Sequence, residues 1–331
     1  ATSICFTPPS LTPAPLRVDP QRAPPGNLSD ANFGRVNELR ALIESSLAAE
    51  SCLGRPWSAG GRAEAEAHTD DFTLMRYTIA RPKSLEEALR MFHESMEWRS
   101  DKNVQRLFCE LHPLAPPCAR LLARNRFYFG GPGGIARDGS AYFVMRVGAM
   151  DLAGLARESQ VLDVMMDADA ANLELVFRTV RACSAATGSF QRTLCIVDVA
   201  GFSLTDLAHI SVAKRVMKIG PQIFPEGASK VLIVNAPLVF AAAWKLVSPF
   251  LPERSRNKCE ILSSWATPAA LAEYIEPEQL PAFLGGEQKE DALATVGRAE
   301  QVPTDHVIDP EGEASGAAGS AAGEAAAVPL A

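Results

Sequence analysis

The sequence lacks the features that mark membrane-spanning, disulfide-stapled and nucleic-acid-binding proteins. No apolar stretch approaches the roughly 20 residues that a membrane-spanning helix requires. The seven cysteines are scattered without a CxxC pair, and their odd number fits free thiols in a reducing compartment better than a secreted scaffold. Acidic residues outnumber basic ones by 39 to 32, so the chain has no overall positive field with which to hold nucleic acid.

Signatures of catalysis are also missing. The GGPGG segment at 130–134 lacks the Gly-Lys-Ser/Thr end of a phosphate-binding loop, and we predict a hairpin turn there. The five histidines show no metal-binding spacing, and His93 is expected on the surface of a helix. Asp198 ends an apolar run and is expected to cap the turn that follows it. We therefore predict no catalytic residues, no metal, no cofactor and no enzymatic activity.

Both ends of the chain have the composition of disordered segments. Residues 1–32 form a Pro-rich leader, with seven prolines among the first 26 residues. Residues 287–331 form an acidic tail that is rich in Ala and Gly and poor in large apolar side chains. Residues 286–331 contain nine acidic and two basic residues, which accounts for the whole net charge of -7. Any anion-binding site in the remaining, neutral part must therefore be local.

Residues 33–125 are predicted to form a helical N-terminal lobe. Apolar residues recur at helical spacing over 33–47, and a second helix is expected over 71–80. Ser84 begins an S-x-x-E capping box, and the apolar stripe that follows it predicts a further helix. The Gly-, Ala- and Glu-rich stretch 54–68 is expected to be a loop.

Residues 126–286 are predicted to form an α/β domain with a mostly parallel sheet. Short continuous apolar runs rich in β-branched residues suit strands that are buried on both faces. Such runs lie at 140–147, 193–199, 230–235 and 259–262. Helical segments are expected between them at 160–186, 204–219 and 238–250.

One helix combines apolar residues on every side with an adjacent basic cluster. The segment 238–250 is almost wholly apolar, which indicates either deep burial or contact with lipid. Within residues 245–258, the only acidic residue is Glu253, and the basic ones are Lys245, Arg254, Arg256 and Lys258. Apolar insertion and attraction to anionic headgroups act together at a lipid surface, so these neighbours favour lipid contact.

Four ordered motifs resemble the CRAL-TRIO lipid-binding domain family. The segment 74–99, which ends in Trp-Arg, is similar to the family's N-terminal helices, and DVAGFSLTDL at 198–207 is similar to its Asp-x-x-Gly turn. The most specific segment is 224–251, with Pro-Glu, a strand, Asn-Ala-Pro and an apolar helix that ends in Ser-Pro-Phe-Leu. LPAFLGGE at 280–287 is similar to the family's closing motif.

The resemblance implies a sheet that floors an apolar cavity for one lipid molecule, most readily phosphatidylinositol, exchanged or transferred at membranes. A gate helix at about 237–251 would open at the membrane, and its side chains are Phe240, Trp244, Val247 and Phe250. The resemblance further implies a monomer in the cytoplasm that associates peripherally with membranes. Lipid kinases or trafficking proteins are the further partners that it implies.

Headgroup residues are carried over from the resemblance position by position. Glu226 and Lys258 match the glutamate and lysine of phosphoinositide-binding members, and Arg81 matches an arginine that contacts the phosphate. The lysine that usually follows this arginine is replaced by Pro82. The hydroxyl pair for phosphatidylcholine falls at Thr193 and Cys195, and a thiol is a far weaker donor than a hydroxyl. The resemblance therefore implies phosphatidylinositol ahead of phosphatidylcholine.

Two other functions stay open at this point. The chain is alternatively a carrier or sensor of another small hydrophobic ligand, tocopherol- or retinoid-like, or a membrane-recruiting module of a larger protein. A doubly wound α/β enzyme would need a nucleotide or metal site, and the sequence displays none.

Overall fold

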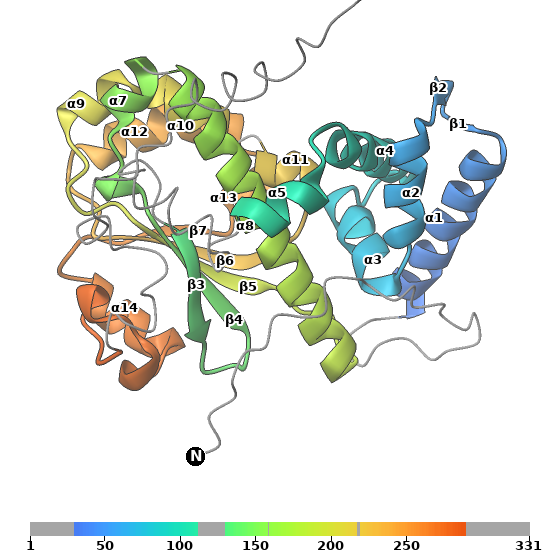
Figure 1. Cartoon of the computed structure of the whole chain (residues 1–331). Coiled ribbons are helices and arrows are strands. Elements are labelled where there is room, and N and C mark those ends of the chain that lie inside the picture. The colour runs from blue at the N-terminus through green and yellow to red at the C-terminus, as the bar shows by residue number, and fades with distance from the viewer. Residues whose placement is uncertain (1–29, 112–129, 158, 217–218, 289–331) are drawn as a thin grey trace, which may run out of the picture.

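The computed structural model describes residues 30–111, 130–157, 159–216 and 219–288. Helices of the first range gather on one side, and a sheet with its covering helices forms the other (Figure 1). Apart from residues 30–32 and 287–288, the predicted leader and tail lie outside the described residues, as does the segment 112–129. The predicted fold class, a helical N-terminal part followed by a mostly parallel sheet, is confirmed.

The bounds of the elements follow the predicted order closely. The helices of the N-terminal side are α1 (Asp30–Ala48), α2 (Ala59–Ala67), α3 (Asp71–Ala80), α4 (Leu85–Asp101) and α5 (Val104–Leu111), with a small hairpin of β1 (Ser51–Cys52) and β2 (Arg55–Pro56). The sheet strands are β3 (Gly130–Ile135), β4 (Ala141–Arg146), β5 (Thr193–Asp198), β6 (Ala228–Val234) and β7 (Cys259–Ile261). The helices among and after them are α7 (Leu152–Arg157), α8 (Ser159–Thr187), α9 (Leu204–Ala208), α10 (Ile210–Val216), α11 (Ile219–Ile223), α12 (Phe240–Val247), α13 (Glu253–Arg256) and α14 (Thr267–Tyr274). Short 3₁₀ turns lie at Val147–Ala149, Ser248–Phe250, Pro277–Gln279 and Ala282–Leu284.

Side-chain caps start the helices of the N-terminal side. Ser58, Asp70 and Ser84 each accept a hydrogen bond from the backbone N–H three residues further on. The prediction of a loop over 54–68 is wrong, because α2 begins after Ser58. A Cβ on Gly61 would lie 2.1 Å from a Glu97 carboxylate oxygen of α4. The glycines that lower helix propensity are thus what lets α2 pack closely on α4.

His93 is buried, so its predicted surface position is wrong. Its side chain is 5% exposed, and its ring packs edge-on against Trp57 with the centroids 4.4 Å apart. The hairpin of β1 and β2 leads into Trp57 and covers this face of α4. The spacing of apolar residues along α4 does not predict that a separate hairpin packs over His93.

Within the described residues, the main sheet has the strand order β3-β4-β5-β6-β7. β3 pairs antiparallel with β4, and the remaining neighbours are parallel. The prediction of a turn at 130–134 is wrong, because these glycines form most of β3. A Cβ on Gly133 would lie 1.9 Å from the Tyr142 ring, which occupies this space. The turn lies at 137–139 instead, where Gly139 adopts a φ of 82°.

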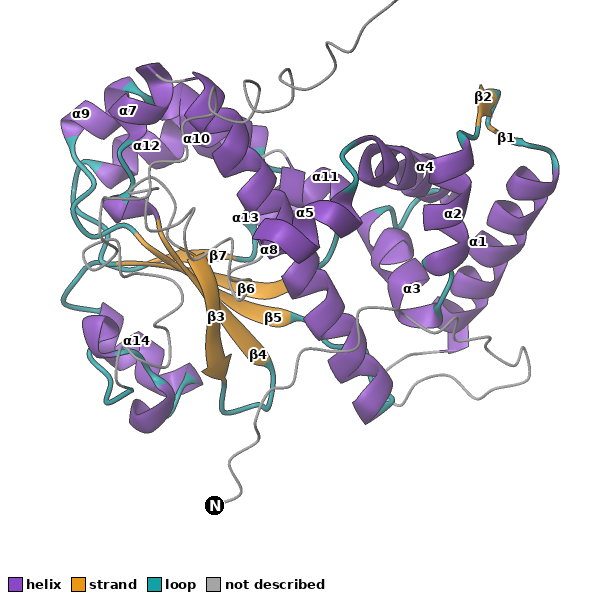
Figure 2. Ribbon diagram, viewed as in Figure 1, coloured by secondary structure: helices purple, strands orange, loops and turns teal. Residues whose placement is uncertain are grey.

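Helices lie on both sides of the sheet (Figure 2), and alternate residues of its strands pack against these two layers. On one face, apolar side chains such as Leu194, Ile196 and Leu232 pack with Leu271 of α14. On the other face, Ile233 packs with residues of α7, α8, α10 and α12. This alternation is what strands covered on both sides require.

Buried ion pairs join the N-terminal helices to α8. Arg99 of α4 forms a bidentate pair with Glu174 of α8 at 2.7 and 3.0 Å, and these residues are 2% and 1% exposed. Glu64 of α2 and Arg178 of α8 complete the network. Burial by itself would raise the pKa of Glu174, but the charge and hydrogen bonds of Arg99 outweigh burial and lower it to about 2.

We expect Glu174→Gln to lower the free energy of unfolding by about 3 kcal/mol at neutral pH, because it removes the bidentate partner of Arg99 and leaves this buried guanidinium with Glu64 as its remaining counter-charge. The folded-state pKa of Glu174 lies below its ordinary value of 4.5, so its contribution is complete above pH 4.5 and is lost as the pH falls towards about 2. The deficit of the variant should therefore shrink over this range. Urea unfolding monitored by circular dichroism at a series of pH values measures both effects.

Glu94→Gln is the matched control, because Glu94 forms an exposed pair with Arg55 at 2.8 Å. Its cost should stay below about 1 kcal/mol. If both variants lost the same free energy of unfolding, the buried pair of Glu174 and Arg99 would stabilise the fold no more than the exposed pair.

Candidate functional site

Glu226 is a buried carboxylate with an uncommon backbone conformation. It precedes β6 and has a φ of 57°, in the left-handed region that few non-glycine residues adopt. Its side chain is only 4% exposed. Its carbonyl oxygen accepts a hydrogen bond of 2.6 Å from Nη1 of Arg76 on α3. The left-handed backbone and the burial of a charge both cost free energy, so the Glu226 carboxylate needs strong hydrogen-bond and ion-pair partners.

Those partners are cationic side chains from three separate segments. Lys258 Nζ lies 2.8 Å from Oε2 of Glu226, and Arg192 Nη1 lies 3.2 Å from the same oxygen. Arg254 Nε on α13 donates to Oε1 at 2.7 Å. Arg192 precedes β5, Glu226 precedes β6 and Lys258 precedes β7, so the site lies at the amino edge of the parallel strands. We call these four residues the Glu226 cluster.

The Glu226 cluster carries more positive charge than its carboxylate neutralises. Burial would raise the pKa of Glu226, but the hydrogen bond and charge of Lys258, followed by those of Arg254, lower it. Burial lowers the pKa of Lys258; Glu226 offsets part of this, while Arg192 and Arg254 add repulsion. A second anion beside these cations would relieve the repulsion, so the arrangement suits a phosphate.

Sequence reasoning placed Arg81 with Glu226 and Lys258, and the structure does not bring it to them. Arg81 ends α3, where its Nη1 donates to the Ala80 carbonyl at 3.1 Å. The arginine of α3 that reaches Glu226 is Arg76, which is fully buried. Its contact spans 150 residues of sequence, and no local signal marks it. Arg192 was also missed, because it stands alone before an apolar strand.

Thr193 and Cys195 lie near the start of β5, the middle strand of the sheet order. The Thr193 hydroxyl donates to the Gly227 carbonyl at 3.2 Å and is 2% exposed, so it already has a partner. Cys195 is a free, half-buried thiol. It stands in one row across the sheet with Val231 and Cys259, which are also only partly buried.

The predicted gate helix is α12, extended by the turn Ser248–Phe250. Phe240 and Val247 are buried against the core, and Trp244 is partly buried. Phe250 is 51% exposed, and Lys214 of α10 lies 4.4 Å from its ring centroid. Leu246 is 46% exposed. α12 therefore has one buried side and one apolar side that faces outward.

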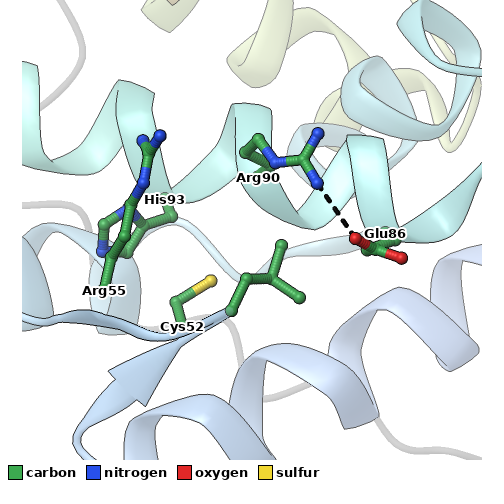
Figure 3. Close-up of a pocket in the computed structure, with 6 residues that line it drawn as sticks. Cys52, Arg55, Glu86, Arg90 and His93 are labelled. Carbon is green, nitrogen blue, oxygen red and sulfur yellow. Dashed lines mark hydrogen bonds and ion pairs between the residues drawn. The ribbon is translucent and has the colours of Figure 1, made fainter.

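A separate pocket of about 290 Å³ lies between the β1–β2 hairpin and α4 (Figure 3). Its lining includes Cys52, Arg55, Glu86, Arg90 and His93. Figure 3 shows Arg90 paired with Glu86, and Arg55 pairs with Glu94 beside it. Because each arginine has its own carboxylate, this pocket lacks the surplus charge of the Glu226 cluster.

The described residues contain neither a cluster of metal ligands nor a membrane-spanning helix. No group of three or more His, Cys, Asp and Glu side chains converges there as metal ligands would. In the same part of the chain, every helix is too short or too polar to cross a bilayer.

The comparisons with known proteins agree with this architecture. The CRAL/TRIO domain family matches residues 128–286, which include the whole sheet and the Glu226 cluster. The solved structure titled "Crystal structure of Sfh5" superposes with a TM-score of 0.53 at 19% identity, over 84% of this chain and 93% of that one. At this identity the likeness concerns the fold.

Curated relatives extend the match beyond the domain. The Sec14 cytosolic factor of Schizosaccharomyces pombe is 30% identical over 66% of this chain and 74% of its own length. The phosphatidylinositol/phosphatidylcholine transfer protein SFH9 of Arabidopsis thaliana is 27% identical over 67% of this chain and 38% of its own length. The share of a relative's own length that this chain matches varies widely. It is 40% for a relative from Anopheles gambiae, 33% for one from Aedes aegypti and 90% for one from Kluyveromyces lactis.

A relative that is 30% identical and matched over 74% of its length, together with the domain match at residues 128–286, makes this chain a member of the CRAL/TRIO family.

Proposed function

We propose that the chain binds a phospholipid, most readily phosphatidylinositol, between its sheet and the helices α8 and α12, and transfers it between membranes without catalysis. The observation that carries this proposal is the Glu226 cluster, where three cations surround one buried carboxylate beside an apolar sheet face. The name of one relative, a phosphatidylinositol/phosphatidylcholine transfer protein, supports transfer rather than enzymatic chemistry.

Partial exposure in the middle of the sheet supports an internal ligand. Cys195, Val231 and Cys259 lie side by side on the three strands β5, β6 and β7. Side chains in such positions are normally closed off by the helices above them, as in close-packed interiors. Their remaining exposure indicates space over this face that the helices do not fill. Acyl chains suit such surroundings, because the sheet row and α12 are apolar.

The proposed headgroup contacts divide by charge. Lys258, Arg192 and Arg254 bind the phosphate, and the Glu226 carboxylate accepts hydrogen bonds from inositol hydroxyls. Arg81, at the end of α3, stays a proposed phosphate contact. The Thr193 hydroxyl is engaged with Gly227, and Cys195 is a weak donor, so neither offers phosphatidylcholine a strong partner.

We further propose that α12 and the Ser248–Phe250 turn are the part that meets the membrane. Phe250 and Leu246 supply apolar insertion, and Lys214 supplies attraction to anionic headgroups. Peripheral attachment to membranes from the cytosol belongs to the same proposal, and the relative from Schizosaccharomyces pombe is named a cytosolic factor. The lobe boundaries 33–125 and 126–286, and a monomeric state, belong to the same proposal.

We expect the purified chain to transfer phosphatidylinositol between vesicles faster than phosphatidylcholine, because only the inositol lipid can use Glu226 together with the cations. Lys258→Ala should lower phosphatidylinositol loading about tenfold or more, since a hydrogen bond to a charged group contributes about 1.5–3 kcal/mol. Fluorescent-lipid transfer between vesicles and mass spectrometry of the re-isolated protein measure the two effects.

Lys102→Ala is the matched control, because Lys102 pairs with Asp167 at an exposed position on the other side of α8. It should leave loading unchanged. Unchanged phosphatidylinositol loading in Lys258→Ala would overturn the headgroup assignment, and a bound lipid without phosphate would favour another hydrophobic ligand.

The membrane surface is tested by a matched pair of leucines. Leu246 of α12 is 46% exposed and Leu42 of α1 is 40% exposed, and the two helices lie at opposite sides of the molecule (Figure 1). Leu246→Ala should weaken binding to anionic vesicles about fivefold or more, because burying a leucine contributes roughly 1.5–3 kcal/mol. Leu42→Ala should bind like the parent chain in vesicle sedimentation. If both substitutions weakened vesicle binding equally, α12 would not be the surface that contacts the membrane.

A further inference from the structure

The long helix α8 presents two polar side chains to the sheet. Asp169 is 3% exposed and Asn172 is 5% exposed, so both are buried. They lie one helical turn apart, between the buried Met165 and the partly buried Val176 on the same side of α8. Met165 packs in the core with Ile233, and Val176 packs beside Phe143 of β4. Asp169 and Asn172 are therefore directed at the middle of the sheet.

Cys195 belongs to the sheet row at which these two side chains are directed. Its neighbour in the row, Phe143, packs beside Val176 of α8. Burial, followed by Cys259 and the charge of Asp169, raises the pKa of the Cys195 thiol. A thiol donates hydrogen bonds only weakly, and the Cys259 thiol at the end of the row donates to the Ser255 carbonyl. The remaining members of the row, Phe143 and Val231, have no polar side-chain atoms. The sheet thus offers Asp169 and Asn172 no strong donor.

The Oδ1 atoms of both residues are left without hydrogen-bond partners among the described residues. Buried polar atoms are almost always paired, and an orphaned acceptor is costly. Burial alone raises the pKa of Asp169 to about 7. Two orphaned acceptors, side by side and opposite a partly exposed apolar row, indicate a missing donor in the same space that the proposed lipid would occupy.

We infer that Asp169 and Asn172 determine lipid specificity by accepting hydrogen bonds from a bound lipid that carries N–H or O–H groups. Phosphatidylcholine has neither group and would leave both acceptors unpaired. Phosphatidylethanolamine, which differs only in lacking the three N-methyl groups, offers three donors. This inference rests on the proposed function, because it requires a lipid between α8 and the sheet.

The acceptor pair is separate from the Glu226 cluster. Thr193 is level with Ala228, just after Glu226, whereas Cys195 lies two residues further along β5. At about 3.3 Å per strand residue, the pair is roughly 7 Å deeper along the strand. Lipids without inositol therefore test it independently of Glu226 and Lys258.

The experiment is competitive loading of the full chain from vesicles that contain equal amounts of dioleoyl-phosphatidylethanolamine and dioleoyl-phosphatidylcholine, with bound lipid quantified by mass spectrometry. We expect the parent chain to load the ethanolamine lipid at least about tenfold over the choline lipid, equivalent to about 1.4 kcal/mol. The double variant Asp169→Leu/Asn172→Leu should bring the ratio close to one, because it removes the acceptors and keeps similar volumes. A parallel competition of dioleoylglycerol against phosphatidylcholine distinguishes a hydroxyl donor from an ammonium donor.

Two further variants keep the test decisive if the double variant does not fold. Asp169→Asn retains an acceptor oxygen and should keep the preference, whereas Asn172→Leu alone should lower it about threefold. Lys102→Ala, at an exposed ion pair with Asp167, is the control and should leave the ethanolamine-to-choline ratio unchanged.

The outcomes separate this inference from the proposed function. A ratio near one in the parent chain, or a double variant with an unchanged ratio, overturns the specificity role while lipid binding stands. A chain that loads no lipid of any kind overturns both.

Discussion

The site depends on one buried guanidinium. Arg76 of α3 donates to the carbonyls of Glu226 and Gln191 at 2.6 and 2.8 Å, and it lies against the rings of Phe190 and Phe177. Burial lowers its pKa to about 10, yet it stays protonated at neutral pH. By holding the backbone on both sides of the amino edge, Arg76 supports the left-handed turn that aims Glu226 at Lys258. The N-terminal helices therefore shape the Glu226 cluster as well as flanking it, and Arg99 anchors the same helices to α8.

The interior combines a charged edge with an apolar face, and in the proposed function the edge binds the headgroup while the face contacts the acyl chains. The Glu226 cluster concentrates positive charge where a phosphate can be paired, so no headgroup charge needs to be buried alone. The row through Cys195 offers acyl chains a surface without strong polar groups. Asp169 and Asn172 interrupt this apolar space with acceptors from α8, opposite that row. In the proposed function, a ligand would be selected by its hydrogen-bond donors as well as by hydrophobicity, and exchange with a membrane would begin at the outward side of α12.

Much of the fold could be predicted from local patterns. The apolar runs at 193–199 and 230–235 became β5 and β6, and Ser84 caps α4 as its motif indicates. The errors share one cause, which is contact with a distant segment. The glycines at 130–134 form a strand because Tyr142 occupies the space above them, and α2 exists because its glycines fit against α4. Likewise, His93 is buried by a hairpin that no spacing within α4 reveals.

The sequence by itself determined the helical and strand order and the family, because these depend on local periodicity and on motifs that stay in register. The resemblance also assigned Glu226 and Lys258 to one expected headgroup site. Only the tertiary structure decided which other charges meet there. Arg76 and Arg192 lie 150 and 34 residues from Glu226, and folding brings them within hydrogen-bond distance at the edge of one sheet. It also decided that Asp169 and Asn172 are buried without partners. Contacts between side chains of distant segments depend on how helices and strands pack together, and the local spacing of apolar residues does not predict that packing.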